Sequence, residues 1–176
     1  RIAEYLKEND IPPSIEVDGQ TLYFTSDRPG GQGGTDIFVS YYSKKGWSKP
    51  VNLGEGVNTS YNEGFPFIHG TNSLFFASKG HTGYGGFDIF KTELNNGKWD
   101  MPSNFGSPVN DHEDQFSLFI TADGTRGYYS HEDGTRENSA RLYEMTIPKE
   151  LQIQYRSNFV KGMVKDRKTG QPLQSR

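Results

Sequence analysis

The sequence is informative first through what it lacks. The 176 residues include no cysteine, which removes both disulfides and thiol chemistry. No apolar run approaches about 20 residues, so we expect no transmembrane segment. The 19 basic and 22 acidic residues are scattered and give a net charge of −3. Phosphate binding needs a basic stripe, so the sequence favours no nucleic-acid partner.

Methionine is also scarce, and aromatic residues take its place. Only 3 Met accompany 12 Phe and 10 Tyr, and 32% of residues are apolar. A core built from rings and β-branched side chains favours strands. Glycine and proline together make 30 of 176 residues, about 17%, which is typical of a chain with many tight turns.

A repeat of 52 residues organises the chain. DIF at 36–38 recurs at 88–90, and LYFTS at 22–26 matches LFFAS at 74–78. Four more pairs share this spacing: Trp47 and Trp99, Pro50 and Pro102, Gly54 and Gly106, Asn58 and Asn110. A third copy follows, with GYYSH at 127–131 and RLYEM where DIF stood, but it has no Trp-x-x-Pro. The chain therefore holds two full copies and one incomplete copy.

Each copy predicts four short antiparallel strands. In the first copy they lie at 13–17, 21–26, 36–42 and 46–53, and Pro50 makes the last one an edge strand. Four strands per repeat of this length favour an all-β fold, a β-propeller with blades at about 12–60, 61–115 and 116–157. Propellers carry about 4 to 8 blades, so we expect these three to belong to a ring of about six. A solenoid is the alternative.

The two ends differ from the repeat. Residues 1–11 predict the end of a preceding helical segment or a linker, and residues 158–176 predict the start of another β domain. We therefore expect the chain to be a piece of a longer protein. Because the third copy lacks its Trp-containing strand, we expect an outer strand from elsewhere, and pairing of residues 151–156 in that place would contradict this expectation.

LYFTSDRPGGQGGTDIF, followed by W-x-x-P-x-N-L-G and V-N-T-x-x-N-E at 47–63, resembles a known repeat. It is similar to the TolB-like propeller repeats of periplasmic OmpA-like proteins, including the PorE-type component associated with type IX secretion. VKGMVKDRKTGQPL at 160–173 is similar to the opening of a carboxypeptidase regulatory-like β-sandwich.

The resemblance implies a non-catalytic scaffold of the periplasm, associated with the outer membrane and peptidoglycan. Its partners would be other protein subunits of an envelope complex, with peptidoglycan bound through an OmpA-like domain outside this chain. Two alternatives stay open. One is the propeller portion of a carbohydrate-active or peptidase-type enzyme, and the other is a glycan-binding module.

The stretch SDRPGGQGGTDIF at 26–38 places four glycines before an aspartate. A phosphate loop opens onto a helix, whereas this loop precedes an expected strand. A calcium loop of the G-G-x-G-x-D kind has one residue fewer. We expect a hairpin loop in which glycines supply positive φ and the aspartate accepts hydrogen bonds from loop amides. The structural turn residues are Gly33, Gly34 and Asp36, and Gly85, Gly86 and Asp88 in the second copy.

Acidic residues recur in the segments between the expected blades, at 61–63 and 111–115. Carboxylates beside an imidazole can bind a metal or act as acid and base. Exposed linkers also normally carry acids, which are solvated or cap strands. The candidate binding residues, including loop residues that differ between copies and rings in or beside loops, are Arg28, Tyr61, Glu63, Tyr84, Asp111 and His112.

No residue set predicts an active site. The chain has no G-x-S-x-G elbow, and HEDG at 131–134 is not the zinc motif H-E-x-x-H. We therefore expect no catalytic residues, no metal site and no cofactor.

Overall fold

The structure, a computed structural model, describes residues 11–16, 18–70, 72–132, 140–149 and 152. These residues form three antiparallel sheets that follow one another along the chain, and they contain no helix. The predicted all-β class is therefore confirmed. Within the same residues, nothing forms a helix of the length and hydropathy needed to cross a membrane.

The first two sheets have the same plan. The first contains β1 (Ile11–Ile15), β2 (Thr21–Ser26), β3 (Asp36–Ser43), β4 (Gly46–Trp47) and β5 (Val51–Asn52). The second contains β6 (Glu63–His69), β7 (Ser73–Ser78), β8 (Asp88–Asn95), β9 (Lys98–Trp99) and β10 (Ser103–Asn104). In each, the first three strands pair in chain order, and both short strands pair with the third.

The third sheet has three strands in the described part of the chain, β11 (Gln115–Ile120), β12 (Arg126–Glu132) and β13 (Ala140–Thr146). The pairing of β11 with β12 can be matched to the pairing of β6 with β7 in the second sheet. Gln115 pairs with His131 where Glu63 pairs with Ser78, so the repeat spacing grows from 52 to 53 residues within the β11–β12 hairpin.

The fourth strand of the repeat differs from the prediction. The single strand expected at 46–53 is two strands of 2 residues, β4 and β5, and its counterpart is divided in the same way around Pro102. Proline has no N–H to give a ladder, so the chain leaves the sheet before Pro50 and returns after it. The first strand also begins earlier than predicted, at Ile11.

The central strands follow from their side chains. All six residues of β2 and all six of β7 are buried, as expected for strands rich in aromatic and leucine side chains that lie between two neighbouring strands. A stacked cross-strand ring pair recurs in every sheet. The pairs are Phe24 with Phe38 (6.2 Å between ring centroids), Phe76 with Phe90 (6.0 Å) and Tyr129 with Tyr143 (5.7 Å).

The core lies between the sheets. Tyr23, Ile37 and Val39 of the first sheet pack on Ile68, Leu74, Phe76 and Phe90 of the second. The next interface repeats this arrangement with Phe75, Ile89 and Val109 against Leu118, Ile120, Tyr129 and Ile147. The second sheet therefore buries one face against the first sheet and the other against the third.

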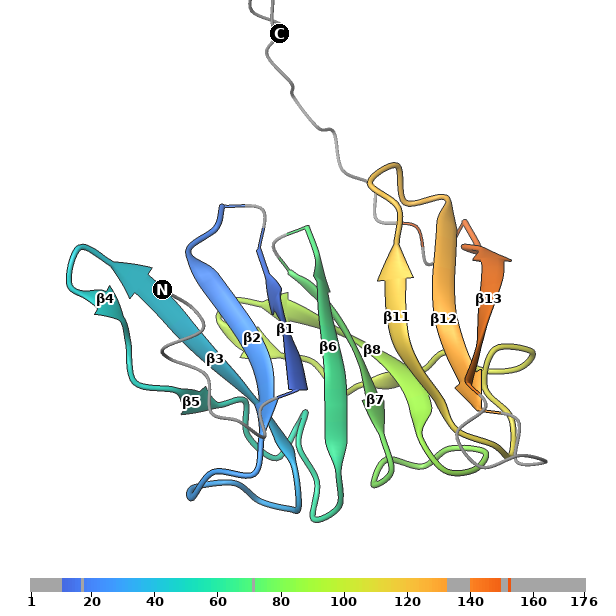
Figure 1. The fold of residues 1–176 in the computed structure, drawn as a ribbon, viewed down its shortest axis with the longest axis horizontal. Helices are drawn as coiled ribbons and strands as arrows, with labels where there is room; N and C mark the ends of the chain where they lie inside the picture. The colour runs from blue at the N-terminus through green and yellow to red at the C-terminus, as the bar shows by residue number, and fades with distance from the viewer. Residues whose placement is uncertain (1–10, 17, 71, 133–139, 150–151, 153–176) are drawn as a thin grey trace, which may run out of the picture.

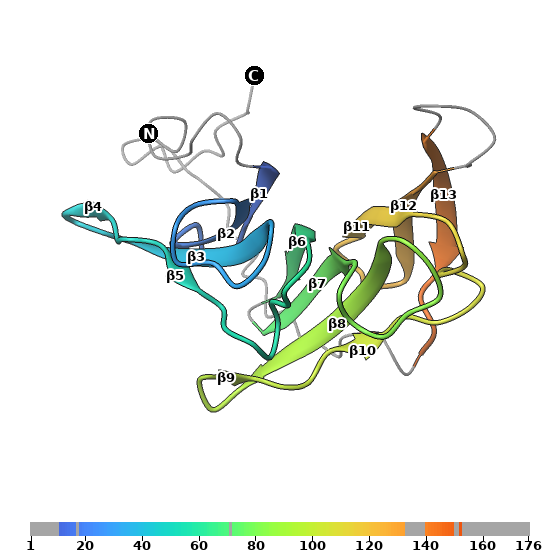
Figure 2. The same ribbon diagram turned by 90° about the horizontal axis from the view of Figure 1, so that it is seen from below.

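The first strands of successive sheets are neighbours, since β1 contacts β6 and β6 contacts β11 (Figure 1). From these strands the three sheets extend in different directions, as seen in Figure 2. β6 and β11 each carry a bulge at the same repeat position, where Phe65 and Ser117 have φ of 52° and 57°.

Three predictions fall outside the described residues. These are the helix end at 1–11, of which only Ile11 is described, the expectation that residues 151–156 do not pair as the missing strand, of which only Gln152 is described, and the β-sandwich start at 158–176. The outer strand from elsewhere in the chain stays a prediction.

The aromatic pairs allow a matched test. Phe90 is 2% exposed, whereas its counterpart Tyr143 is 40% exposed. We expect Phe90→Ala to lower the free energy of unfolding by about 3–5 kcal/mol through the cavity it leaves. Tyr143→Ala should cost about 1–2 kcal/mol, because part of that ring is already in water. Urea unfolding followed by tryptophan fluorescence checks both values, and equal losses would contradict this description of the core.

Candidate functional site

Four connections gather at one end of the sheets, the lower end in Figure 1. They are the β2–β3 loop (27–35), the β7–β8 loop (79–87), and the segments 53–62 and 105–114 that lead to the next sheet. We call this region the loop end. It contains five of the six candidate binding residues, and Glu63 begins the strand beside it.

Asp36 and Asp88 hold the two glycine loops. Oδ2 of Asp36 accepts hydrogen bonds from the amides of Gln32 (2.5 Å) and Gly33 (3.5 Å). Oδ2 of Asp88 accepts one from the amide of Tyr84, at 2.6 Å. Burial raises the pKa of Asp88 above its ordinary value of 3.8, and the hydrogen bonds it accepts oppose that shift.

Gly30 in the first loop has a positive φ of 97°, as predicted, but the four named turn glycines serve a different purpose. Gly33, Gly34, Gly85 and Gly86 do not have positive φ. A Cβ at Gly33 would overlap the backbone carbonyls of Thr59 and Tyr61, and one at Gly85 would overlap the backbone of His112. Glycine is needed because each loop lies directly on the segment leading to the next sheet.

A buried asparagine shapes each of these connecting segments. The side chain of Asn58 accepts a hydrogen bond from the Ile37 amide (2.8 Å) and donates one to the Ile37 carbonyl (2.9 Å). It also donates to Asn52 Oδ1, which accepts from the amide of Gly54. Asn110 makes the same bonds 52 residues later with Ile89 and Asn104, which explains why these residues recur.

The sequence suggested that Glu63 is an exposed linker residue. In the structure it is instead 0% exposed. Its carboxylate accepts hydrogen bonds from the amide and hydroxyl of Thr59 and from the hydroxyl of Ser78, each at 2.7 Å. A carboxylate with three donors is stable in the interior. Glu63 therefore closes the turn at 59–63 and cannot contact a partner.

The next copy replaces all three members of this cluster. Asp111, Gln115 and His131 stand where Thr59, Glu63 and Ser78 stood. Gln115 donates from Nε2 to Asp111 Oδ1 at 2.6 Å and accepts from the Asp111 amide at 3.1 Å. His131 Nε2 lies 3.0 Å from Asp111 Oδ2. In the second copy the carboxylate therefore belongs to the half-exposed Asp111, at the position of Thr59, and the buried position of Glu63 holds the neutral Gln115.

Asp111 thus pairs with His131 rather than with His112, the imidazole that sequence adjacency suggested. Partial burial raises the pKa of Asp111, but hydrogen bonds from His131, Gln115 and the amide of Glu113 outweigh it and hold the pKa below 3.8. Nδ1 of His131 is buried and has no hydrogen-bond partner among the described residues. The side chain of His112 is 83% exposed and lies 3.3 Å from Glu113.

The remaining candidates lie at the surface or on a sheet face. Arg28 covers the rings of Phe24 (4.6 Å) and Phe38 (5.5 Å) and donates from Nε to Ser26 at 2.9 Å. This side chain therefore packs on the first sheet. Tyr61 and Tyr84 are 62% and 57% exposed. Rings this accessible are suited to protein contacts.

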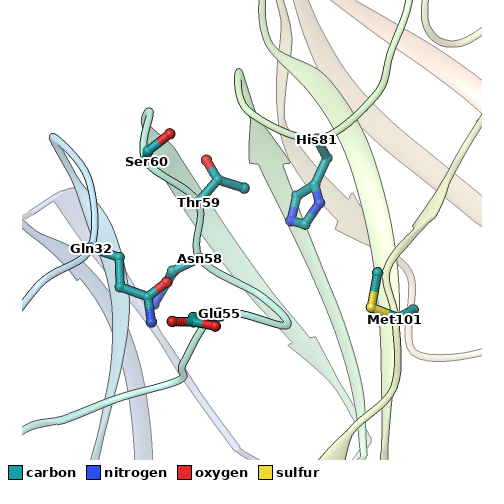
Figure 3. Close-up of a pocket in the computed structure, with 7 residues that line it drawn as sticks. All are labelled: Gln32, Glu55, Asn58, Thr59, Ser60, His81 and Met101. Carbon is teal, nitrogen blue, oxygen red and sulfur yellow. The ribbon is translucent and has the colours of Figure 1, made fainter.

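A cavity of about 540 Å³ opens at the loop end between the first and second sheets. Its lining residues are Gln32, Glu55, Asn58, Thr59, Ser60, His81 and Met101. Figure 3 shows Gln32 and Glu55 on one side of this space, with His81 and Met101 on the other. None of its residues was among the candidates, although Thr59 and Ser60 stand one repeat before Asp111 and His112.

Within the described residues, no three His, Cys, Asp or Glu side chains are arranged to hold a metal ion. Comparison with protein-family models and with curated proteins finds no match to this chain. The geometry of the loop end therefore carries the functional argument.

The close contact between Gly33 and the backbone of the segment at 59–61 can be tested by comparing Gly33 with Gly56, which has open space around it. We expect Gly33→Ala to lower the free energy of unfolding by about 1–3 kcal/mol, because the added methyl group meets rigid backbone. Gly56 has no atom near its added Cβ and no positive φ, so Gly56→Ala should stabilise the fold by about 0.4–1 kcal/mol. Urea unfolding distinguishes the two, and a neutral Gly33→Ala would refute the contact.

The Asp111–His131 pair predicts a dependence of stability on pH. The pKa of Asp111 is lower in the folded state, so its contribution is complete above pH 3.8 and is lost as the pH falls through the folded pKa. The stability difference between wild type and Asp111→Asn should therefore shrink as the pH is lowered from 6 to 3. His131→Gln should reduce this difference, whereas the control His112→Gln should not. Urea unfolding at each pH provides the measurement, and a constant difference would exclude the pair.

Proposed function

We propose that the chain forms three blades of a β-propeller ring of about six blades, and that the ring is a non-catalytic protein-interaction scaffold. We place this scaffold in the periplasm, associated with the outer membrane and peptidoglycan, as a component of type IX secretion. That placement is supported by the resemblance of residues 22–63 and 160–173 to the proteins named above.

The uncovered third sheet supports the propeller. Leu142 and Tyr143 on β13 are 74% and 40% exposed, whereas their counterparts Ile89 and Phe90 are 1% and 2% exposed. Ile89 packs in the core shared with the third sheet, whereas Phe90 packs in the core shared with the first. A further sheet beyond the third would bury Leu142 as the third sheet buries Ile89, and ring closure requires such a sheet.

The main support for the scaffold function is that recurring and variable residues of the loop end have different surroundings. Polar side chains that recur in the repeat, such as Asp36 and Asn58, are used in internal hydrogen bonds. Residues that change between copies, such as Tyr61, Tyr84 and His112, are the exposed ones. The fold does not need these variable residues, so they are available for recognition.

The Asp111–His131 pair is the feature that favours an enzyme instead. A carboxylate that orients an imidazole is part of many hydrolytic sites. No serine or threonine hydroxyl is among the hydrogen-bond partners of His131 in the described part of the chain. The repeat also explains the pair, because it occupies the position of the closing cluster around Glu63.

Site-specific photocrosslinking in the full-length protein in its own cells tests the scaffold. A crosslinking residue at Tyr61 or Tyr84 should give the same discrete protein adduct. Control positions Tyr41 and Tyr42 are each 51% exposed at the end of β3 that lies away from the loop end, and they should not give it. Adducts at the controls alone, or none, would contradict the proposal. Hydrolysis of muropeptides that is lost in Asp111→Asn would show an enzyme.

A further inference from the structure

The lining of the 540 Å³ cavity is not what the repeat requires. Gln32, Glu55 and Ser60 are replaced 52 residues later by Tyr84, Ser107 and His112. Only the buried Asn58 is kept, as Asn110. Residues that the fold leaves free to vary thus form most of the wall.

Three of the amide and hydroxyl side chains in this wall already make internal hydrogen bonds. Both Nδ2 hydrogens of Asn58 go to Ile37 and Asn52. The Thr59 hydroxyl donates to Glu63. In its satisfied orientation the Gln32 amide donates to the Asn58 carbonyl and accepts from the amide of Glu55. Of the lining side chains, these three therefore offer little to a ligand.

What remains accepts hydrogen bonds. His81 Nε2 lies 2.8 Å from the Val57 carbonyl, which can only accept, so Nε2 is the protonated nitrogen of the neutral ring and Nδ1 is an acceptor. The carboxylate of Glu55, an exposed residue, has no ion-pair partner among the described residues. The lining holds no lysine or arginine. The cavity thus combines one negative charge with unused acceptors.

We propose that this cavity binds a primary ammonium group of a partner protein, a lysine side chain or a chain N-terminus. An ammonium has three donors and no acceptor, which complements the carboxylate of Glu55 in a lining that holds no lysine or arginine. Met101 is 79% exposed on the opposite wall and offers a flexible apolar surface for the aliphatic stem of lysine. The inference rests on the proposed scaffold function, and it names the group that the scaffold recognises.

The test is a titration of the isotope-labelled protein followed by amide NMR shifts. The probes are Nα-acetyl-lysine methylamide, its Nε-acetylated derivative, and glycinamide as a model of a chain N-terminus. We expect the lysine probe to shift residues 55–60 and 81, and the Nε-acetylated probe, which has lost the charge, to shift none of them. Saturation by glycinamide at lower concentration than by the lysine probe would assign the site to an N-terminus, and the reverse order would assign it to a side chain.

Glu55→Gln keeps the shape of the side chain and should weaken binding of the lysine probe by about tenfold or more. Glu144→Gln removes an exposed carboxylate on the third sheet and should leave binding unchanged. Equal binding of the charged and acetylated probes would overturn the proposal, as would unchanged affinity in Glu55→Gln. Shifts of the same residues by a neutral oligosaccharide, without shifts by either amine, would identify a glycan site instead.

The two proposals fail separately. Crosslinks from Tyr61 and Tyr84 without amine binding would refute the ammonium site and leave the scaffold. Amine binding that depends on Glu55, without any crosslinked protein, would refute the scaffold and leave the site.

Discussion

The structure depends on one repeated interaction, a buried asparagine side chain that pairs with the backbone of a neighbouring strand. Asn58 fills both the donor and the acceptor of Ile37, and Asn110 does so for Ile89. Each bond is made in the interior, where an unpaired amide or carbonyl would be costly. The asparagine fixes where the chain leaves one sheet, and this sets the position at which the next sheet begins.

Other features of the loop end follow from this fixed exit. The segment after Asn58 passes close under the glycine loop, so the loop can carry no side chain at Gly33. The same segment turns into β6 through the bonds that Thr59 donates to Glu63. The cavity in Figure 3 is the space left between this segment and the two loops beside it. Its variable residues stand on a framework that recurs.

Much of this could be predicted from the sequence, because the repeat reveals shared structure. Residues such as Phe38 and Phe90, 52 apart, lie in equivalent buried pairs, and the all-β class follows from them. Spacing could not show why Gly33 is a glycine, since steric contact with a distant carbonyl leaves no local pattern. It also could not reveal the partner of Asp111, because the extra residue in the β11–β12 hairpin hides the match between His131 and Ser78.

The exchanged cluster has a consequence for how the two copies diverged. The pair Thr59 and Glu63 and the pair Asp111 and Gln115 differ at two positions that are in direct contact. A combination of aspartate with glutamate would set two carboxylates against each other in a largely buried turn, which like-charge repulsion disfavours. A combination of threonine with glutamine avoids this, because the neutral glutamine can still accept a bond from threonine. Single substitutions between the two pairs, in either direction, therefore avoid facing carboxylates only through the threonine–glutamine combination.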